Sequence, residues 1–378
     1  MLPLEGIRVL DFTHEVAGPN CTLLLADAGA EVIKIEIPGR GDRARHWPLM
    51  EESVFIACNR NKKSIALNLK KEEDRKIAYE LVKISDVLVE NFVPGTMERL
   101  GLGYDVVSKL NPKIIYCSIS GYGQDGPYRT RPAWDAIIQA ETGLMDLTGE
   151  PDGPPCRIPS SIIDAITGAY AAYAILLALM HREKTGKGQR IDISLFDAAI
   201  HVQGYWIAWY TMTGNMPKRA GSGSPVVGAP YEAFKTKDSY IFIAAFEDKA
   251  WQTLCKLLNI EYLLEDDRFK TNEGRARHRI ELHNEIEKVT TQFTTSELYK
   301  MLVDANIVCA PVRTIPEVIN HPQVLHKKLL REITYKGRKV KVPGPILRFS
   351  EIKLDIKSKP AELIGQHTEE ILKKFNLI

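Results

Sequence analysis

Residues 9–36 read VLDFTHEVAGPNCTLLLADAGAEVIKIE and alternate two kinds of pattern. VLDF and EVIKIE are short, largely apolar runs, whereas CTLLLADAGA between them has apolar residues at helical spacing. Largely apolar strands separated by helical segments are typical of parallel sheets whose two faces are covered by helices. The stretch therefore predicts a βαβ unit at the start of an α/β fold.

The same alternation continues along the first half of the chain. Further strand-like runs are SIALNL, DVLVENF and KIIYCSISG, and KKEEDRKIAYELVKIS between the first two has helical periodicity. Ligands of parallel sheets bind at the carboxyl ends of the strands, so the residues after each run matter most. Three runs end in turn-forming or polar residues, in DFTHEVAGP, VENFVPG and SISGYGQDGP, and we expect these loops to line one site.

The pattern changes in the second half. A long helix is expected from Thr167 to about Lys184, ended by the glycines of TGKGQ, and RIDISL predicts a strand before one aromatic-rich helix. TGNMPKRAGSGSPVVGAPY is rich in Gly, Pro and Ser and indicates a hinge. Beyond it, SYIFIAAF and several amphipathic charged segments predict a small α+β unit over about residues 225–320.

Composition is that of an ordinary globular protein. The 378 residues suggest about two domains, and 50 basic against 48 acidic residues give no field that favours nucleic acid or an anionic membrane. Six cysteines lie far apart without a Cys-x-x-Cys pair, which predicts no metal site. The apolar run AAYAILLALM is too short for a bilayer and predicts a buried core helix. MLPLEGIRVLDF does not resemble a signal peptide, so we expect a cytoplasmic protein.

One carboxylate, Asp164, interrupts the small and apolar stretch SSIIDAITGAYAAYAI at residues 160–175. An Asp directly before a helix is a preferred N-cap, since its side chain accepts backbone N–H bonds. The positive end of the helix dipole also favours the ionised carboxylate, and an ionised carboxylate in a dry pocket is a competent nucleophile. The residues alone leave both interpretations open.

Other motifs give weaker signals. GRGDRA at residues 39–44 has the outline of a dinucleotide fingerprint but runs into RHWP instead of a helix, and AGSGSP lacks the Gly-x-Ser-x-Gly elbow of hydrolases. His14, His181 and His201 lie in or beside apolar patterns, where we expect structural roles. A basic set near predicted loops either holds phosphates or forms a solvated rim, and it comprises Arg40, Arg43, Arg45, Lys62, Lys63 and Arg99.

Seven motifs in series resemble the class III CoA-transferase family, which includes formyl-CoA transferase, carnitine CoA-transferases and α-methylacyl-CoA racemase. They are VLDFTHEVAGPNCTLLLADAGAEVIKIE, NRNKKSIALNLK, VLVENFVPGTMERLG, SISGYGQDGPY, AIIQAETGLMDLTGEPDGPP, IIDAITGAYAAYAILLAL and KTGKGQRIDISLFDA. The resemblance covers essentially the whole chain, and seven motifs in this order are highly specific.

The resemblance implies a fold that the patterns show only in part. It implies a large CoA-binding domain with a parallel Rossmann-like sheet, formed by residues 1–200 and the C-terminal tail, residues 325–378. Between these parts we expect a linker at residues 201–224 and a small α+β domain at residues 225–324. The family resemblance further implies an interlocked homodimer.

Functional residues are implied by the matching motif positions. Asp164 corresponds to the family's catalytic aspartate, which attacks the thioester carbonyl of an acyl-CoA and forms an acyl-aspartyl anhydride. The implied activity is transfer of CoA to a small carboxylic acid, with CoA as substrate and neither a metal nor a permanently bound cofactor. Backbone N–H groups of Gly221 and Gly223 are candidate oxyanion donors by position. The residues implied to contact the acyl-CoA are Glu15, Val16, Lys63, Asn91, Phe92, Arg99, Leu100 and Trp134.

Two departures from the family pattern bear on the function. After IKIE the family often has an arginine, whereas this chain has Ile37, and Arg40 or Arg43 is the candidate replacement. The racemase branch is implied to use a histidine base at the position of Trp134, and an indole N–H donates only and cannot exchange a proton with a substrate carbon. We therefore expect Trp134 to pack over the acyl group, with plain core packing as the other interpretation. A CoA-transferase is favoured over a 2-methylacyl-CoA racemase that uses other bases and over a non-catalytic CoA-binding protein.

Overall fold

The computed structural model describes residues 1–224 and 226–377. Its contacts divide the chain into two compact units. The first contains Met1–Thr142, Ile158–Gly204 and Pro322–Ile378, and the second contains Gly143–Arg157 and Tyr205–His321. Residues 143–157 thus lie in the second unit, whereas the predicted large domain included them. Position 225, where the small domain is predicted to begin, lies outside the described residues.

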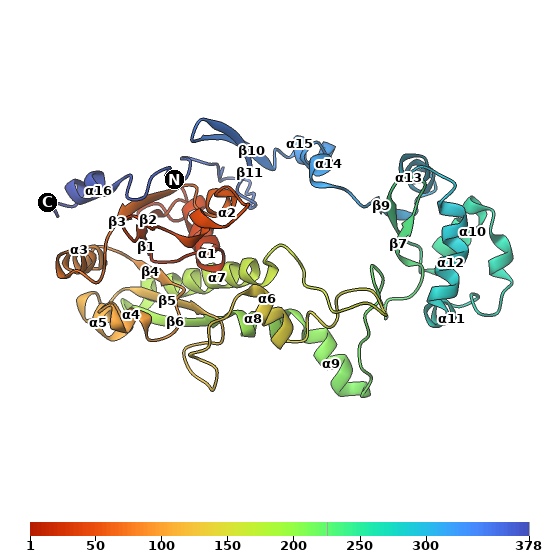
Figure 1. Cartoon of the computed structure of the whole chain (residues 1–378), viewed down its shortest axis with the longest axis horizontal. Coiled ribbons are helices and arrows are strands. Elements are labelled where there is room, and N and C mark those ends of the chain that lie inside the picture. Colours follow the sequence, from red (N-terminus) through yellow and green to blue (C-terminus); the bar gives the residue numbers. More distant parts are fainter. Residues whose placement is uncertain (225, 378) are drawn as a thin grey trace. The chain divides into compact units, whose positions relative to one another are not determined.

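A six-stranded parallel sheet forms the centre of the first unit (Figure 1), in the order β3-β2-β1-β4-β5-β6. This is the strand order of doubly wound Rossmann-like sheets. The strands are β1 (Arg8–Asp11), β2 (Glu31–Glu36), β3 (Lys62–Ala66), β4 (Val87–Glu90), β5 (Ile115–Ser120) and β6 (Gln189–Ser194). Each overlaps one of the predicted strand runs, so the predicted α/β class with a parallel sheet is confirmed.

Helices cover both faces of this sheet. One face packs on four helices through a buried apolar cluster that includes Ile33, Leu81 and Leu88. The four are α3 (Glu72–Lys83), α4 (Thr96–Arg99), α5 (Tyr104–Leu110) and α16 (Thr368–Lys374). The other face carries α1 (Ala17–Asp27) and α7 (Ile162–Thr185), which pack on each other. Since α7 ends just before β6 enters the sheet, its N-terminus lies near the carboxyl ends of the strands.

The long helix α7 begins at Ile162 rather than at the predicted Thr167. It ends at Thr185, and the next residue, Gly186, has a φ of +71°, which fits the predicted glycine stop. Among the described residues, α7 is the one helix long and apolar enough to cross a bilayer. Eight of its residues are nonetheless buried within the chain. Close packing on α1 requires Gly168, because a Cβ there would lie 2.5 Å from the Ala17 carbonyl oxygen.

Shorter elements complete the first unit. The last two residues of GRGDRA and the two that follow form one 3-10 turn instead of a fingerprint helix, and the predicted aromatic-rich helix is two helices, α8 and α9. Helices α6 and α8 pack on α7, and the C-terminal part adds a hairpin of β10 and β11. The bounds are η1 (Arg43–His46), α2 (Ser53–Cys58), α6 (Asp135–Glu141), α8 (Leu195–Val202), α15 (Pro322–His326), β10 (Leu330–Tyr335) and β11 (Arg338–Pro343).

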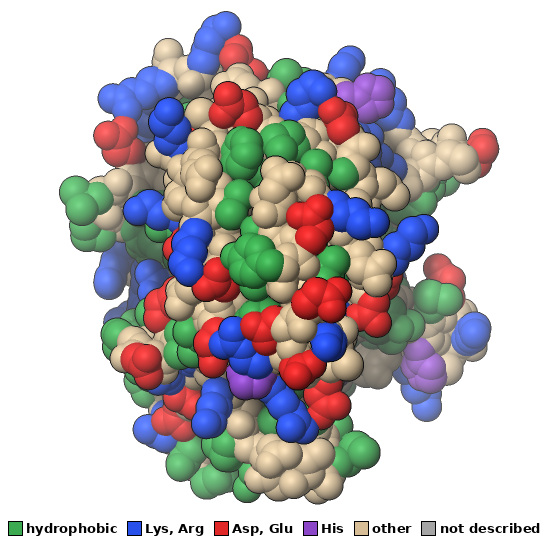
Figure 2. Space-filling view, turned by 90° about the vertical axis from the view of Figure 1, so that its right-hand side faces the viewer, with side chains coloured by type: hydrophobic (Ala, Val, Ile, Leu, Met, Phe, Trp, Pro, Cys, Tyr) green, Lys and Arg blue, Asp and Glu red, His purple; other side chains and the backbone are tan. Residues whose placement is uncertain are grey.

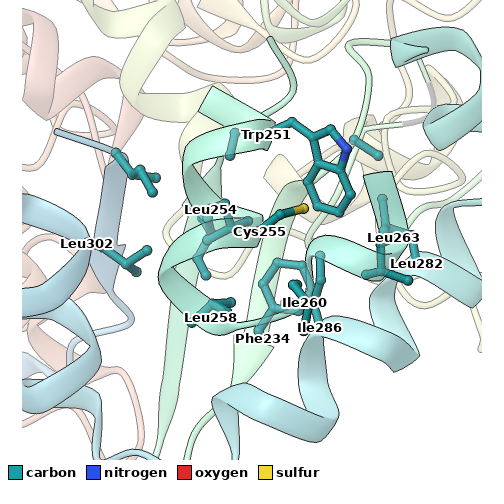
Figure 3. Close-up of a cluster of buried hydrophobic side chains, with 14 of the residues drawn as sticks. Phe234, Trp251, Leu254, Cys255, Leu258, Ile260, Leu263, Leu282, Ile286 and Leu302 are labelled. Carbon is teal, nitrogen blue, oxygen red and sulfur yellow. The ribbon is translucent and has the colours of Figure 1, made fainter. Parts of the chain in front are cut away.

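The second unit has its own core, which confirms the predicted small α+β unit. An antiparallel sheet in the order β7-β8-β9 is covered by helices, and Phe234, Trp251 and Ile286 pack together in the buried cluster of Figure 3. The strands are β7 (Tyr231–Lys235), β8 (Tyr240–Ala244) and β9 (Val308–Pro311). The helices are α9 (Gly204–Thr213), α10 (Asp248–Leu258), η2 (Glu261–Leu264), α11 (Asn272–Arg277), α12 (Arg279–Thr290), α13 (Thr295–Asp304) and α14 (Ile315–Ile319).

Surface charge is mixed on the face shown in Figure 2. Lys and Arg side chains alternate there with Asp and Glu side chains, in keeping with the formal net charge of +2. Interspersed charges of both signs produce only weak long-range fields. This face therefore gives no electrostatic basis for binding a polyanion.

Candidate active site

Loops at the carboxyl ends of the strands enclose a cavity of about 300 Å³ in the first unit. The loop after β1 contributes His14, Glu15 and Val16, and the loop after β4 contributes Asn91 and Phe92. The loop after β5, the segment before α6 and the first turn of α7 also line it, through Ser120, Gly121, Pro132, Ala133, Trp134 and Asp164. The three loops expected from the sequence therefore line one site together with Asp164.

The loop after β1 has an unusual backbone conformation. Glu15 has a φ of +67°, in the left-handed region that non-glycine residues seldom adopt. The Asn91 side chain holds His14, the residue before Glu15. Its Oδ1 accepts from the His14 N–H and its Nδ2 donates to the His14 carbonyl, both at 2.8 Å. Asp42 accepts from the Glu15 N–H at 2.9 Å. Both polar atoms of the Asn91 amide thus bind the backbone of this loop. The contact of Asn91 with CoA stays a prediction.

Buried charges support this loop from the sheet side. Asp11, the last residue of β1, accepts from the Lys62 ammonium at 3.0 Å. Lys34 of β2 donates to the Thr13 carbonyl at 2.7 Å and pairs with Asp42 at 2.8 Å. The four charged side chains are at most 3% exposed, so each charge depends on its partners. The geometry of the cavity loop therefore rests on this buried charge network.

Asp164 lies in the first turn of α7, and its predicted role as the N-cap is wrong. The N-cap residue is Ser161, whose side chain makes no capping bond. The capping acceptor is Asp135 of α6, whose Oδ2 accepts from the N–H groups of Ile163 at 2.7 Å and of Asp164 at 3.1 Å. Asp164 itself lines the cavity. Its carboxyl group is therefore not used to cap the helix.

Two carboxyl groups of the cavity have raised pKa values. Burial, followed by the charges of Asp135 and Glu15, raises the pKa of Asp164 to about 7. Burial also raises the pKa of Glu15, although the Arg43 guanidinium counteracts it. A carboxyl group with a pKa near 7 is partly ionised at neutral pH, and its ionised form is more basic than an ordinary aspartate. Perturbed carboxyl groups in one cleft are typical of catalytic sites.

Trp134 directly precedes α6 and is 57% exposed, so the core-packing interpretation is wrong. Its indole lowers the pKa of the Glu15 carboxyl, against the larger effect of burial, and its side chain lines the cavity. The indole supplies an aromatic wall beside Asp164. Packing of this wall over an acyl group stays a prediction.

Trp134→Ala is expected to change the free energy of unfolding by less than about 1 kcal/mol, because the side chain is mostly exposed. The same change should raise KM for acyl-CoA by about tenfold, since it removes the aromatic wall. Urea unfolding and steady-state kinetics measure the two effects. Trp251→Ala is the matched control, because Trp251 is 2% exposed and its truncation should cost about 3–5 kcal/mol. A comparable stability loss at Trp134 would contradict the expected role.

Three residues implied to bind CoA do not line this cavity. Lys63 pairs with Glu370 at 2.6 Å and lies 3.9 Å from Glu31, the first residue of β2, so its ammonium lies toward the amino ends of the strands. Arg99 is exposed on α4, and Leu100 packs partly on the apolar core. The roles of these three residues in nucleotide binding stay predictions.

The remaining basic residues divide into two groups. Arg40 and Arg43 line the cavity together with Ile37, so both are placed to supply the charge that an arginine at position 37 would supply. Arg45 and Lys62 are structural instead, and neither forms a solvated rim. Arg45 is paired with Glu36 at 2.8 Å and is 8% exposed, and Lys62 is buried in the charge network described above.

Gly221 and Gly223 lie in a loop of the second unit. The Gly221 N–H donates to the Gly149 carbonyl and the Gly223 N–H donates to the Ala220 carbonyl, each at 2.9 Å. An oxyanion role would require both bonds to open, and it stays a prediction. A Cβ at Gly223 would lie 2.6 Å from a guanidinium nitrogen of Arg279, so this arginine packs directly on the loop.

A second cavity, of about 550 Å³, lies beside this loop within the second unit and is lined by Gly221, Glu232, Arg279 and His283 among others. Glu232 is 4% exposed and accepts from Arg279 at 2.6 Å. His283 Nδ1 lies 3.2 Å from the same carboxylate, and its ring stacks on Phe234 with the centroids 4.9 Å apart. The neighbouring Glu232 carboxylate raises the pKa of His283 above its ordinary value.

His283 is expected to make the stability of the second unit depend on pH. Because its folded pKa lies above the unfolded value of about 6.5, its contribution is fully present below pH 6.5 and is lost as pH rises through the folded pKa. His283→Asn should therefore destabilise the protein more at pH 6 than at pH 9, as measured by urea unfolding at both values. An equal loss at the two pH values would show that the imidazolium does not contribute.

Sequence reasoning missed three side chains that shape the first cavity. Asp135 follows Trp134 at a recognisable helix start, but its partners lie 28 and 29 residues further along the chain. Asp42 lies in GRGDRA, which offered no signal once the fingerprint was rejected. His14, taken as structural, lines the cavity with its Nδ1 3.7 Å from Asp42. His14 lies within the predicted loop DFTHEVAGP, which was the signal that could have identified it, whereas Asp42 follows β2 and lies outside the three predicted loops.

Comparison with known proteins identifies related enzymes. CoA-transferase family III matches residues 4–368 of the chain. The succinyl-CoA:glutarate CoA-transferase of Mus musculus is 41% identical over 379 residues, which cover 99% of this chain and 86% of the relative. The acetyl-CoA:oxalate CoA-transferase of Acetobacter aceti is 38% identical over 349 residues, which cover 90% of each chain.

Solved structures give the same result for the fold. A CAIB/BAIF family protein from Brucella suis matches with a TM-score of 0.90 at 36% sequence identity, over 99% of both chains. The match therefore extends over both units. Together with the family match over nearly the whole chain, it shows that this protein belongs to CoA-transferase family III and is a CoA-transferase.

Proposed function

We propose that this enzyme moves CoA from an acyl-CoA thioester to a small carboxylic acid through a covalent intermediate on Asp164. One observation carries the proposal: the Asp164 carboxyl lines the cavity at the carboxyl ends of the strands, while Asp135 caps its helix. A carboxylate that no structural bond occupies can attack a carbonyl carbon. Its raised pKa strengthens this attack by the ionised form.

In this proposal the transfer takes four steps, each a nucleophilic substitution at a carbonyl carbon. An oxygen of ionised Asp164 attacks the thioester carbonyl, the C–S bond breaks, and an acyl-aspartyl anhydride and the CoA thiolate form. The thiolate attacks the aspartyl carbonyl, gives an aspartyl-CoA thioester and releases the donor acid as its carboxylate. The acceptor carboxylate attacks this thioester and forms a second anhydride with renewed release of the thiolate. The thiolate then attacks the acceptor acyl carbonyl, which frees Asp164 and yields the new CoA ester without net proton transfer.

Other cavity residues supply walls and charge in this proposal. Glu15, Val16 and Phe92 line the CoA chain beside the nucleophile, and Trp134 covers the acyl group. Arg40 and Arg43 contact phosphate oxygens of CoA, because guanidinium groups match phosphate geometry and both line the cavity. For Glu15, Val16, Phe92 and Trp134 these are the roles implied by the sequence, and all four residues line the cavity.

The acceptor acid is proposed to be a short dicarboxylic acid. The support is that the relatives named above include succinyl-CoA:glutarate and acetyl-CoA:oxalate transferases, whose named acceptors are both dicarboxylic acids. A dicarboxylic substrate keeps one free carboxylate when the other is bound as a thioester. The guanidinium groups of the cavity are suitable partners for such an anion.

A homodimer located in the cytoplasm is proposed as the working form. Exposed apolar side chains support association, since Tyr173 and Met180 of α7 are 61% and 57% exposed and Met212 of α9 is 85% exposed. Such groups are usually covered in an assembly. Light scattering after size exclusion should give twice the chain mass of 42.5 kDa, whereas a monomer at micromolar concentration would contradict the dimer.

Trapping tests the covalent step. The enzyme is incubated with a panel of acyl-CoA donors and dicarboxylic acids, products are followed by mass spectrometry, and hydroxylamine is added during turnover. We expect a hydroxamate on the peptide that carries Asp164. An unmodified Asp164 in an enzyme that turns over would overturn the mechanism. Deuterium uptake at the α-carbon of a 2-methylacyl-CoA without any acid acceptor would support the racemase instead.

A further inference from the structure

The first turn of α7 has no cap of its own. Ser161 at the N-cap position has a left-handed backbone, with φ of 45° and ψ of 50°, and its side chain makes no capping hydrogen bond. A helix start leaves several backbone N–H groups without partners, and these groups need acceptors when they are buried. Asp135 of α6 supplies the acceptor for two of them, the N–H groups of Ile163 and Asp164.

Asp135 is itself fixed by a buried neighbour on the same helix. It is 3% exposed, and its Oδ1 accepts from Gln139 Nε2, whose side chain is fully buried. Gln139 also holds the chain ahead of α7, since its Oε1 accepts from the Ile158 N–H at 2.8 Å and its Nε2 donates to the Ile158 carbonyl at 3.1 Å. One pair of side chains on α6 thus holds both ends of the segment that leads into Asp164.

We propose that Asp135 is a positioning residue of the transferase: it fixes the backbone of the nucleophile Asp164, and Gln139 in turn fixes Asp135. The inference rests on the proposed function, because it assumes that Asp164 is the nucleophile. Asp135 is not among the residues that line the cavity, so it acts through Asp164 and not on the substrate. An error of about 1 Å in the position of a reacting group can lower the rate about 100-fold, which gives such anchoring a measurable effect.

The charge of Asp135 adds a second effect on the same residue. The charges of Asp135 on α6 and Glu15 in the loop after β1 act on Asp164, which shares the cavity with His14 of that loop and with Arg40 and Arg43 of the segment after β2. After burial, Asp135 makes the next largest contribution to the raised pKa of Asp164, ahead of Glu15. Removing this negative charge while keeping an oxygen acceptor should therefore lower the pKa of Asp164.

Asp135→Asn removes the charge and keeps an amide oxygen for the two backbone N–H groups, but its amide nitrogen, in the place of Oδ1, cannot accept from Gln139. The pH profile of this variant therefore reports the charge, and Gln139→Ala reports the loss of that bond. We expect kcat/KM, measured from pH 5 to 9, to have an acid limb near pH 7 in the wild type and at lower pH in Asp135→Asn. With a pKa of about 7, kcat/KM at pH 6 is roughly 10% of its plateau, and a shift of one unit would raise it to roughly 50%. An unchanged limb in a folded variant that still labels Asp164 with hydroxylamine would overturn the inference.

Gln139→Ala tests the anchoring separately, because it keeps the charge of Asp135 and removes its support. We expect kcat to fall at least about tenfold with little change in KM, an unchanged acid limb, and faster hydrogen exchange at the Ile163 and Asp164 amides. Wild-type kcat and exchange would overturn the positioning role, and this variant decides the question if Asp135→Asn does not fold. Failure to label Asp164 in the wild type would instead refute the proposed function, so the two failures are distinguishable.

Discussion

Asp164→Asn is expected to lower CoA transfer by about 10⁴-fold or more, because an amide cannot form the anhydride and removal of a catalytic nucleophile has effects of this size. Binding of free CoA should change by less than about threefold, since the substitution is nearly isosteric and leaves the capping bonds of Asp135 in place. Mass spectrometry of acid products measures transfer, and calorimetric titration with CoA measures binding. Loss of binding in parallel with activity would indicate that Asp164 holds substrate and does not react.

A control for this substitution exists in the same unit. Asp105 also lies in the first turn of a helix, α5, but it is exposed to solvent. Asp105→Asn should therefore leave transfer unchanged. A loss of activity in this control would show that Asn at a helix start disturbs the unit by itself.

Asp164→Asn should also show that the ionised nucleophile lowers the stability of the folded protein. The folded pKa of Asp164, about 7, lies above the ordinary value of 3.8, so ionisation of this carboxyl destabilises the folded state as pH rises from 3.8 to 7. Asp164→Asn is therefore expected to unfold at a higher urea concentration than the wild type at pH 8, and at a similar concentration near pH 4. Active-site residues commonly lower the stability of the folded state in this way.

The second large effect is expected at the buried charge network beneath the cavity loop. Asp11→Ala should destabilise the protein by about 3–5 kcal/mol, because it leaves the ammonium of Lys62 buried without its carboxylate partner. Transfer should fail in parallel, since Asp11 also accepts from the Thr13 N–H at the start of the cavity loop. Urea unfolding followed by circular dichroism measures the loss.

Two further variants test the origin of that loss. Adding Lys62→Met to Asp11→Ala removes the unpaired charge and should recover part of the stability. Glu72→Ala breaks an exposed ion pair with Lys76 and should have no measurable effect. If the double variant is as unstable as Asp11→Ala, the loss comes from the cavity and the missing hydrogen bonds instead.

The pH dependence of the Asp11 contribution has the opposite sign to that of Asp164. Burial alone would raise the pKa of Asp11, but the charges of Lys34 and Lys62 outweigh it and bring the pKa to about 2. The contribution to stability is thus present above about pH 3.8 and is lost as pH falls through 2. The difference between wild type and Asp11→Ala should therefore shrink below pH 4.

Local patterns predicted most of the fold, because strands and helices of a doubly wound sheet have distinct hydrophobic periods. The apolar runs gave six strands, and the glycines of TGKGQ gave the end of α7. The start of α7 was misplaced at Thr167, because the cap is supplied by Asp135 from another helix and leaves no signal beside Ile162. The split between α8 and α9 was missed because both segments are apolar and no proline marks the break.

The candidate site was predictable where it depends on strand ends and not where it depends on side-chain partners. Strand ends brought Glu15, Phe92 and Asp164 to one cavity. Lys63 could not be placed in the same way, since residues of one strand point to alternate faces and its ammonium meets Glu370 near the C-terminus. Long-range partners of this kind have no trace in local sequence.

The backbone hydrogen bonds that hold the loop after β1 have a consequence for changing the substrates of this enzyme. Asn91 and Asp42 accept hydrogen bonds from the backbone N–H groups of His14 and Glu15, so the path of the loop does not depend on the side chain of Glu15. Its left-handed backbone accepts Gly, Asn or Asp with little strain and rejects β-branched residues. A library at position 15 confined to these residues would vary polarity and volume beside Asp164 on an unaltered scaffold, and directed evolution of acyl selectivity can start there.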